Sequence, residues 1–362
     1  MPKAEALRKT IQRKRTVVQA VPAAPTDLQS LQIPDDFKTY EAAPGQLEDF
    51  LLVDTGPGPN RILVFGRTGN MTWCGEVQSL YLDGTFKQAP PLFHQVYVIL
   101  AERNGHIFPL LYALLPNKRR QTYQQLFQEI AQRWPTLNPA SISIDYEIAA
   151  FQEVQTAFPN AQLFGCLFHL TRNMKKKLTD EQLLGRYNTD ANFALQARMI
   201  VALAFVPIDS IEDALDALSD PQTGVHGDLQ PILDWMEDNY IGRLNRNNTR
   251  RPPMFPIRMW NVYERTINGQ DRTNNHAEAA HRRLQSVLQM DHPSIWKFIK
   301  GLRKVQKERD MAFEQMVAGN SPPAKRRKYR QADERILKLA TDFANRPCAE
   351  YLRGIAHNFE MN

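Results

Sequence analysis

The chain of 362 residues contains little cysteine, and this scarcity argues against several classes of protein. Its three cysteines, Cys74, Cys166 and Cys348, lie far apart in the sequence. They therefore predict neither a disulfide framework nor a zinc finger, whose ligands are closely spaced. A reducing intracellular compartment is the setting that this pattern favours.

Long apolar runs are also missing. The longest runs, such as LYALLP at 111–116, fall far short of the ~20 residues that span a bilayer. The first fifteen residues, MPKAEALRKTIQRKR, have no apolar segment of the kind that a secretory signal requires. We therefore expect no membrane association.

Positive charge is concentrated in two blocks, and the net charge of the chain is +6. Residues 3–15 carry six basic side chains against one acid, and residues 325–330 read KRRKYR. Either block is suited to contact phosphate groups, and the second also resembles a nuclear localisation signal. The alternative is that both are merely solvated, solubilising segments.

The hydrophobic pattern predicts an α/β core. Three successive strands are expected first, with connections too short for a crossover helix, so we expect neighbouring strands to be antiparallel. Helices and strands then alternate. This β-β-β-α-β-α-β-α order is typical of an RNase H-like (retroviral-integrase-like) fold. The expected strands are 78–86, 94–102, 106–116, 141–147 and 161–168, and the expected helices are 122–134, 148–158 and 169–178.

A long helical stretch follows this core. Strand signals disappear between about 180 and 265, where amphipathic helical patterns take over, and two more helices are expected at 273–290 and 293–316. We therefore expect an all-helical insertion before the last catalytic helix. The predicted segments are a basic N-terminal segment and linker (1–35), the core (36–178), the helical insertion (179–265), C-terminal catalytic helices that complete the core (266–316) and a basic C-terminal tail (317–362). Within the tail, the stretch AGNSPPAKRRKYRQ (318–331) is expected to be disordered or loosely held.

Two aspartates stand at the ends of expected strands. Asp83 lies in LYLDGTFK and Asp145 lies in SISIDYE. In an RNase H-like topology these strands are neighbours, so both carboxylates would point into one site. A carboxylate among apolar residues needs a positive partner, and a divalent metal ion is one. The alternative is that each aspartate only opens a turn, as Asp-Gly pairs often do.

Further candidates are Glu278 and a set of zinc-type ligands. Glu278 sits among small residues in HAEAA and would be a third oxygen ligand for Mg2+, although a solvated surface glutamate is the simpler interpretation. Cys166 and His169 form a C-x2-H pair, and His276 and His281 in HAEAAH form a second pair. Together they would bind a structural Zn2+ ion. The alternative is a buried cysteine beside a locally bonded histidine.

Several linked segments resemble the Mutator-like element (MULE) transposase family. They are DGTF (83–86), PLLYALLP (109–116), DYEIAA (145–150), GCLFHLTRN (165–173) and RTNNHAEAAH (272–281), in family order, and the resemblance covers roughly residues 5–310. The chain departs from the family pattern at Ala280, where a bulky aromatic residue is expected. It also lacks an upstream zinc-type DNA-binding domain, which would fit a truncated element or a host gene derived from one.

The resemblance implies a DDE-type transposase that cleaves and joins DNA strands by two-metal phosphoryl transfer. Asp83, Asp145 and Glu278 would be the catalytic, metal-binding acids, with Mg2+ or Mn2+ as cofactor, and Cys166, His169 and His281 match the positions of the family's cysteine and histidines. The implied partners are terminal inverted repeats and target DNA, with a homo-oligomer expected for pairing two DNA ends. The implied location is the nucleus.

Two other functions fit the same residues. One is a domesticated, catalytically silent protein that binds DNA or chromatin without cleaving it. The other is a general nuclease of the same fold that acts on RNA or on DNA–RNA hybrids. An intact set of acids favours an enzyme over the silent protein.

Overall fold

The computed structural model describes residues 22–23, 25–222, 224–247, 249–322, 324–359 and 361. Most of the basic N-terminal segment predicted at 1–35 lies outside these residues. Contacts group the chain into two compact units. The first takes in the chain up to Val77, Asp83–Leu137 and His276–Asn320; the second takes in Gln78–Leu82, Asn138–Asn275 and the chain from Ser321 onward. The predicted segment boundaries stay predictions.

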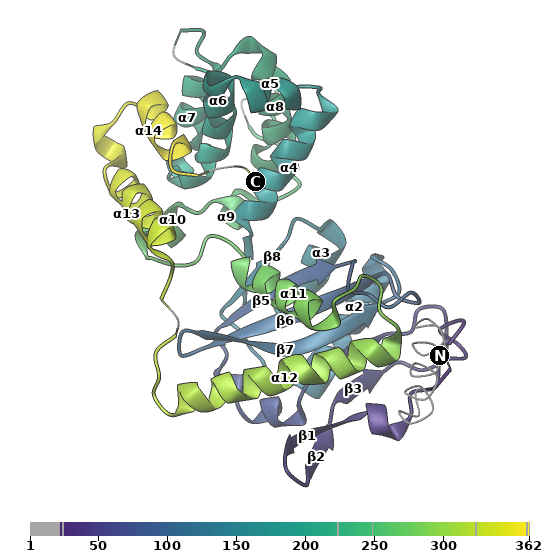
Figure 1. Cartoon of the computed structure of the whole chain (residues 1–362). Helices are drawn as coiled ribbons and strands as arrows, with labels where there is room; N and C mark the ends of the chain where they lie inside the picture. The colour runs from purple at the N-terminus through teal and green to yellow at the C-terminus, as the bar shows by residue number, and fades with distance from the viewer. Residues whose placement is uncertain are drawn as a thin grey trace, which may run out of the picture. The chain divides into compact units, whose positions relative to one another are not determined.

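A mixed sheet forms the α/β core, as the sequence predicts (Figure 1). Within the described residues it has seven strands in the order β3-β4-β7-β6-β5-β8-β9. β3, β4, β7 and β6 pair antiparallel, whereas β5, β8 and β9 pair parallel. The strands are β3 Leu51–Asp54, β4 Leu63–Phe65, β5 Ser79–Thr85, β6 Gln95–Arg103, β7 His106–Leu115, β8 Ser141–Ile144 and β9 Gln162–Gly165.

The β6–β7 hairpin lies at the centre of the first unit. Residues 95–101 of β6 and 108–115 of β7 are buried, and Val, Ile and Leu suit a pleated surface covered on both faces. Asn104 and Gly105, at φ 51° and 75°, form the turn, and two left-handed residues match the twist of a tight hairpin. The expected antiparallel pairing of these two strands is confirmed.

Three helices and a small sheet complete the first unit. α2 (Arg120–Arg133) buries Tyr123 and Phe127 beside Tyr97 of β6, and α12 (Ile295–Val317) packs on β7. α11 (Asn275–Leu288) precedes α12 and buries Leu284 and Leu288. The two-stranded sheet of β1 (Thr39–Ala43) and β2 (Gln46–Asp49) has no counterpart in the sequence prediction.

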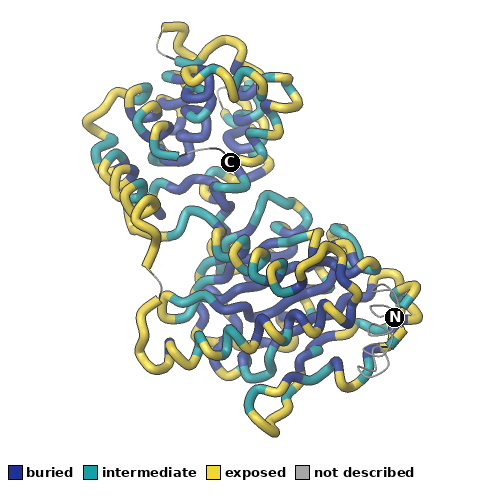
Figure 2. Tube along the Cα trace, viewed as in Figure 1, coloured by how far each residue is buried: buried dark blue, intermediate teal, exposed yellow. Residues whose placement is uncertain are grey.

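The second unit is mainly helical, in agreement with the helical pattern expected between about 180 and 265. Its central helix is α6, and eight residues of this helix are buried (Figure 2). α4, α5, α8 and α14 pack on α6, and the strand pairing described in this stretch is one isolated bridge, Leu244 to Arg250. The helices here are α3 Ile148–Ala157, α4 Leu167–Asp180, α5 Leu184–Thr189, α6 Ala191–Ala202, α7 Ile211–Ser219, α8 Gln230–Met236, α9 Ile257–Trp260 and α10 Tyr263–Ile267.

The C-terminal stretch contains two helices, and the first of them includes residues 327–331, which were expected to be loosely held. It forms α13 (Arg327–Thr341) and α14 (Cys348–Ala356). α13 buries Ile336 and Ala340 and packs on α10, while α14 buries an apolar stripe against α6 and α7. Apolar residues at helical spacing follow the basic residues 325–330, and their burial holds both helices on the second unit. Among the described helices, none is long and apolar enough to cross a membrane.

Candidate metal centre

The parallel ladder between β5 and β8 sets the positions of the two predicted aspartates. Ser79 pairs with Ser141 and Tyr81 pairs with Ser143. Asp83 follows Tyr81 by two residues, and Asp145 follows Ser143 by two residues. Since side chains two apart on a strand share a face, this register brings Asp83 and Asp145 level at the same edge.

A histidine joins the two carboxylates. β9 ends at Gly165, and α4 begins two residues later with His169 in its first turn. One ligand atom from each of Asp83, Asp145 and His169 lies within 4.8 Å of the others, which is close enough for a shared metal ion. Asp83 is buried, whereas Asp145 and His169 are half-buried. Among the acids, histidines and cysteines of the described residues, these three are the ones found close enough together to share a metal ion.

Neighbouring groups hold the carboxylate of Asp83. The Gly84 N–H donates to its Oδ1 at 2.9 Å, and Nδ1 of His281 lies 3.7 Å from its Oδ2. A Cβ at Gly84 would lie 2.5 Å from Oε1 of Gln95, so only glycine fits here without displacing a side chain that is fully buried. The glycine of DGTF therefore lets β5 lie close to Gln95 directly after the acid.

Glu278 lies on α11, three residues before His281. Residues at this spacing share a helix face, so Glu278 lies on the face that carries His281 toward Asp83. Its Oε2 is 3.8 Å from Nη1 of Arg282, and its side chain is 26% exposed. Glu278 is not a member of the three-residue group, and its role as third acid stays a prediction.

The sulfur of Cys166 lies next to a backbone N–H group, whereas in a zinc site it would lie next to other metal ligands. Its buried Sγ accepts a hydrogen bond of 3.0 Å from the backbone N–H of Asn274. Among the residues suggested for zinc, His169 joins the two carboxylates and His281 lies beside Asp83. The zinc hypothesis for Cys166, His169 and His281 stays a prediction.

Asn274 ties the segment before α11 to the sheet. Nδ2 of the buried Asn274 donates to the carbonyl of Leu82 on β5, at 2.9 Å. The Leu167 N–H, at the start of α4, donates to the carbonyl of Arg272 at 3.0 Å. The segment before α11 is thus fastened to β5 and to α4. The RTNN motif was the available signal, but the motif does not indicate which strand the amide reaches.

Arg265 adds a positive charge behind the end of β9. It is 4% exposed, its Nη2 donates to the Gly165 carbonyl at 3.2 Å, and its guanidinium lies over the Phe164 ring. Burial lowers the pKa of Arg265 to about 10, so the group remains charged at neutral pH. The buried cation thus lies behind the end of β9, next to the segment from which α4 begins.

The donor set fits a divalent cation. Two carboxylates supply the oxygen ligands that Mg2+ and Mn2+ prefer, and an imidazole nitrogen suits Mn2+ or Zn2+. Repulsion between two ionised carboxylates at this separation is relieved when a cation lies between them. The buried position of Asp83 adds to the need for a positive partner.

Comparison with known families identifies the same region. Residues 79–173 match the family model of the MULE transposase domain, a stretch that runs from β5 into α4 and contains Asp83, Asp145 and His169. Glu278, His281 and Asn274 lie outside the match. No curated protein matches the chain. The chain therefore contains a MULE transposase domain at residues 79–173.

Proposed function

We propose that this protein is a DDE-type phosphoryl transferase that cuts DNA strands and joins them to target DNA. The observation that carries the proposal is the group of Asp83, Asp145 and His169 on adjacent elements of the matched domain. Transposase-related function follows from the family, and the acidic group supports the finer assignment of metal-dependent strand cleavage.

An RNase H-like core is part of this proposal. The β6–β7 hairpin next to β5, followed by parallel β8 and β9 with α3 between them, supports it. The catalytic acids of such a core would lie where the neighbouring strands β5 and β8 end. The helices between α4 and α11 would then be an insertion that precedes the third acid, Glu278.

The metal ligands would be Asp83 and Asp145, with Glu278 completing the set. A bound Mg2+ or Mn2+ would lower the pKa of an attacking oxygen and neutralise charge on the phosphate. His281, beside Oδ2 of Asp83, orients that carboxylate. His169 is close enough to the acids to accept the proton that a water or a 3′-hydroxyl loses as it attacks.

The chemistry would proceed in two displacements at phosphorus. In the first, a water oxygen forms a bond to phosphorus, the bond from phosphorus to the 3′-oxygen breaks, and that oxygen takes up a proton. In the second, the freed 3′-hydroxyl attacks a phosphodiester of the target strand and expels its 3′-oxygen. Terminal inverted repeats and target DNA are the proposed substrates, and a homo-oligomer would pair two DNA ends.

Nuclear location belongs to the same proposal. Every residue from 325 to 330 is exposed, and Arg326, Arg327 and Lys328 form its central basic run. An exposed run of this kind is available to an import receptor. Lys325 is partly engaged, since its Nζ lies 3.2 Å from Oδ1 of Asp271.

A silent DNA-binding protein is the second candidate. The observation that favours it concerns the three residues with metal-binding spacing, Asp83, Asp145 and His169. They include only two of the three proposed acids, because Glu278 is not one of them. In this case the protein binds DNA and does not cleave it.

A nicking assay separates the two candidates. Purified protein is incubated with supercoiled DNA and Mg2+ or Mn2+, beside Asp145→Asn and the matched control Asp180→Asn, an exposed acid at the end of α4. We expect metal-dependent nicking by the wild type and by Asp180→Asn, and none by Asp145→Asn. Folded wild-type protein that binds DNA and leaves it intact would contradict cleavage and favour the silent candidate.

A further inference from the structure

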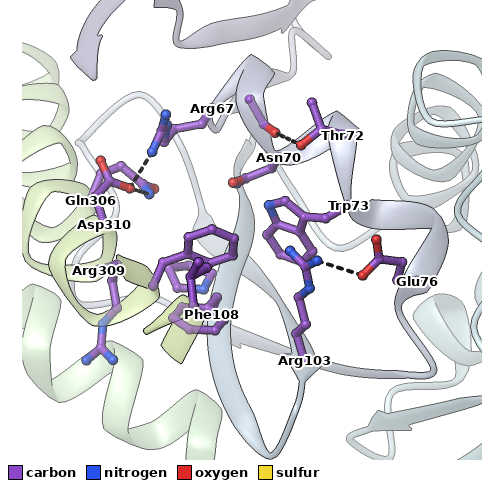
Figure 3. Close-up of a pocket in the computed structure, with 14 residues that line it drawn as sticks. Arg67, Asn70, Thr72, Trp73, Glu76, Arg103, Phe108, Gln306, Arg309 and Asp310 are labelled. Atoms are coloured by element: carbon purple, nitrogen blue, oxygen red, sulfur yellow. Dashed lines mark hydrogen bonds and ion pairs between the residues drawn. The ribbon is translucent and has the colours of Figure 1, made fainter. Parts of the chain in front are cut away.

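A pocket of about 460 Å³ lies within the first unit (Figure 3). It is formed by the turns η2 (Thr68–Thr72) and η3 (Cys74–Glu76), the tip of the β6–β7 hairpin, and the C-terminal half of α12. Its volume is within the range of small-molecule sites. The hairpin tip is far from the acids. β6 begins at Gln95, which lies beside Gly84, the residue after Asp83, and it ends at Arg103 in the pocket. At strand spacing, Gln95 and Arg103 are roughly 26 Å apart.

Aromatic rings form one wall of the pocket. Trp73 and Phe313 are stacked with centroids 5.8 Å apart, and Phe108 meets Phe313 edge-on at 5.4 Å. Trp73 and Phe108 are buried, whereas Phe313 is half-buried. Phe313 is therefore the least buried of the three rings, although the guanidinium of Arg103 lies 5.4 Å from its centroid, and the exposed Val317 lines the same pocket.

Three guanidinium groups line the pocket, and they differ in how many carboxylate partners they have. Arg67 is held by Glu48 and by Asp310, the latter at 2.8 Å. Arg103 pairs with Glu76 at 2.7 Å, but the Glu76 side chain is 61% exposed, and such pairs contribute little. Arg309 has no hydrogen-bond or ion-pair acceptor among the described residues, and Figure 3 shows its side chain extending from α12.

Arg309 is an unusual cation for its position. It follows Leu302 by seven residues and Val305 by four, so it lies in line with the buried stripe of α12, but its own side chain is only half-buried. Burial, and then the charge of nearby Arg283, lower the pKa of the Arg309 guanidinium. A half-buried guanidinium without an acceptor among the described residues keeps its N–H donors available for a bound anion.

The other polar groups narrow the ligand class. Asn70, 7% exposed, lines the same pocket, and its Nδ2 has no acceptor among the described residues. Three guanidiniums against the two carboxylates of Glu76 and Asp310 leave one net positive charge. The pocket thus matches a singly charged anion that carries a planar, apolar group.

We propose that this pocket binds one nucleotide of a DNA strand, with its phosphodiester on Arg309 and Arg103 and its base on Phe313. Arginine pairs with phosphate through parallel hydrogen bonds, and bases stack on exposed aromatic faces. The choice of a nucleotide over other monoanions rests on the proposed function. The pocket is then a second contact for DNA, separate from the acidic group.

The test compares two charge-removing variants of α12. Binding of a fluorescein-labelled oligothymidylate of about ten nucleotides is followed by anisotropy for wild type, Arg309→Met and Lys304→Met. Lys304 is exposed on the same helix, and methionine keeps the packing of either side-chain stem. We expect Arg309→Met to raise Kd by about tenfold or more, because a charge-assisted hydrogen bond is lost, and Lys304→Met to raise it by less than about threefold. Equal effects of the two variants, or no effect of either, would overturn the proposal.

Second measurements guard against a folding defect and identify the source of the nucleotide. Phe313→Leu keeps the charge and removes the ring, and we expect it to raise Kd by about fivefold or more through lost stacking. Unlabelled competitors are then added to the bound, labelled oligothymidylate. Displacement of the probe by thymidine monophosphate at matching concentration would show that the pocket accepts a free nucleotide. Displacement by unlabelled oligonucleotide alone would show that it requires a nucleotide within a DNA strand. Equal displacement by benzoate would overturn nucleotide recognition. A wild type that never nicks DNA, yet whose binding depends on Arg309, would refute the proposed function and leave the pocket standing.

Discussion

Replacing Asn274 by alanine tests how the segment before α11 is fastened. Asn274 is 1% exposed, and its Nδ2 donates to the Leu82 carbonyl, one residue before Asp83. Alanine removes that donor and leaves the carbonyl on β5 without it. The backbone hydrogen bond from Asn274 to Sγ of Cys166 remains available, so the variant isolates the side chain.

The expected loss of stability follows from the burial of this hydrogen bond. Leaving a buried acceptor unsatisfied costs about 1–3 kcal/mol. At the roughly 2–4 °C per kcal/mol of domains of 150–250 residues, the midpoint of thermal unfolding should fall by roughly 2–12 °C. Nicking should fall as well, because the same segment leads into the helix that carries Glu278 and His281.

The neighbouring Asn275→Ala is the matched control. Asn275 is exposed, and surface substitutions usually change stability by less than about 0.5 kcal/mol. Thermal unfolding of both variants is followed by circular dichroism beside the nicking assay. Equal midpoints for Asn274→Ala and Asn275→Ala would refute the view that the Asn274 amide fastens this segment to β5.

Two further predictions concern the cysteine and the basic run. Cys166→Ser should retain nicking, because the serine hydroxyl can accept the hydrogen bond that Sγ of Cys166 accepts. Its metal content, measured by plasma mass spectrometry, should also be unchanged. Loss of bound zinc would instead identify Cys166 as a zinc ligand. Replacing Arg326, Arg327 and Lys328 together by alanine should lower the nuclear fraction of a fluorescent fusion without changing its unfolding midpoint, because all three are exposed. An unchanged nuclear fraction would contradict the localisation proposal.

The strands of the core could be predicted because local pattern and tertiary environment agree there. β6 and β7 are long, apolar and joined by an Asn-Gly turn, and each of these features is local. The helices between α4 and α11 were also predictable, since amphipathic spacing persists over several turns. β1, by contrast, carries the polar and mixed sequence TYEAA, and its pairing with β2 depends on the turn rather than on an apolar alternation.

The candidate site was predictable only in part. Asp83 and Asp145 stand at strand ends, and parallel register brings their side chains together. His169 could be singled out from the C-x2-H pair, but that pair does not indicate the two carboxylates that lie beside the histidine. Cys166 meets Asn274, more than one hundred residues away, and no local pattern encodes that contact.

The central claim is that Asp83 and Asp145 hold a divalent metal ion, and Mn2+ binding tests it most directly. Free Mn2+ is measured by its electron paramagnetic resonance signal while wild type, Asp83→Asn, Asp145→Asn and Asp180→Asn are titrated in turn. The account predicts that wild type and Asp180→Asn remove Mn2+ from solution at the same protein concentration, while each of the other two binds at least about tenfold more weakly. Equal binding by all four folded proteins would contradict it.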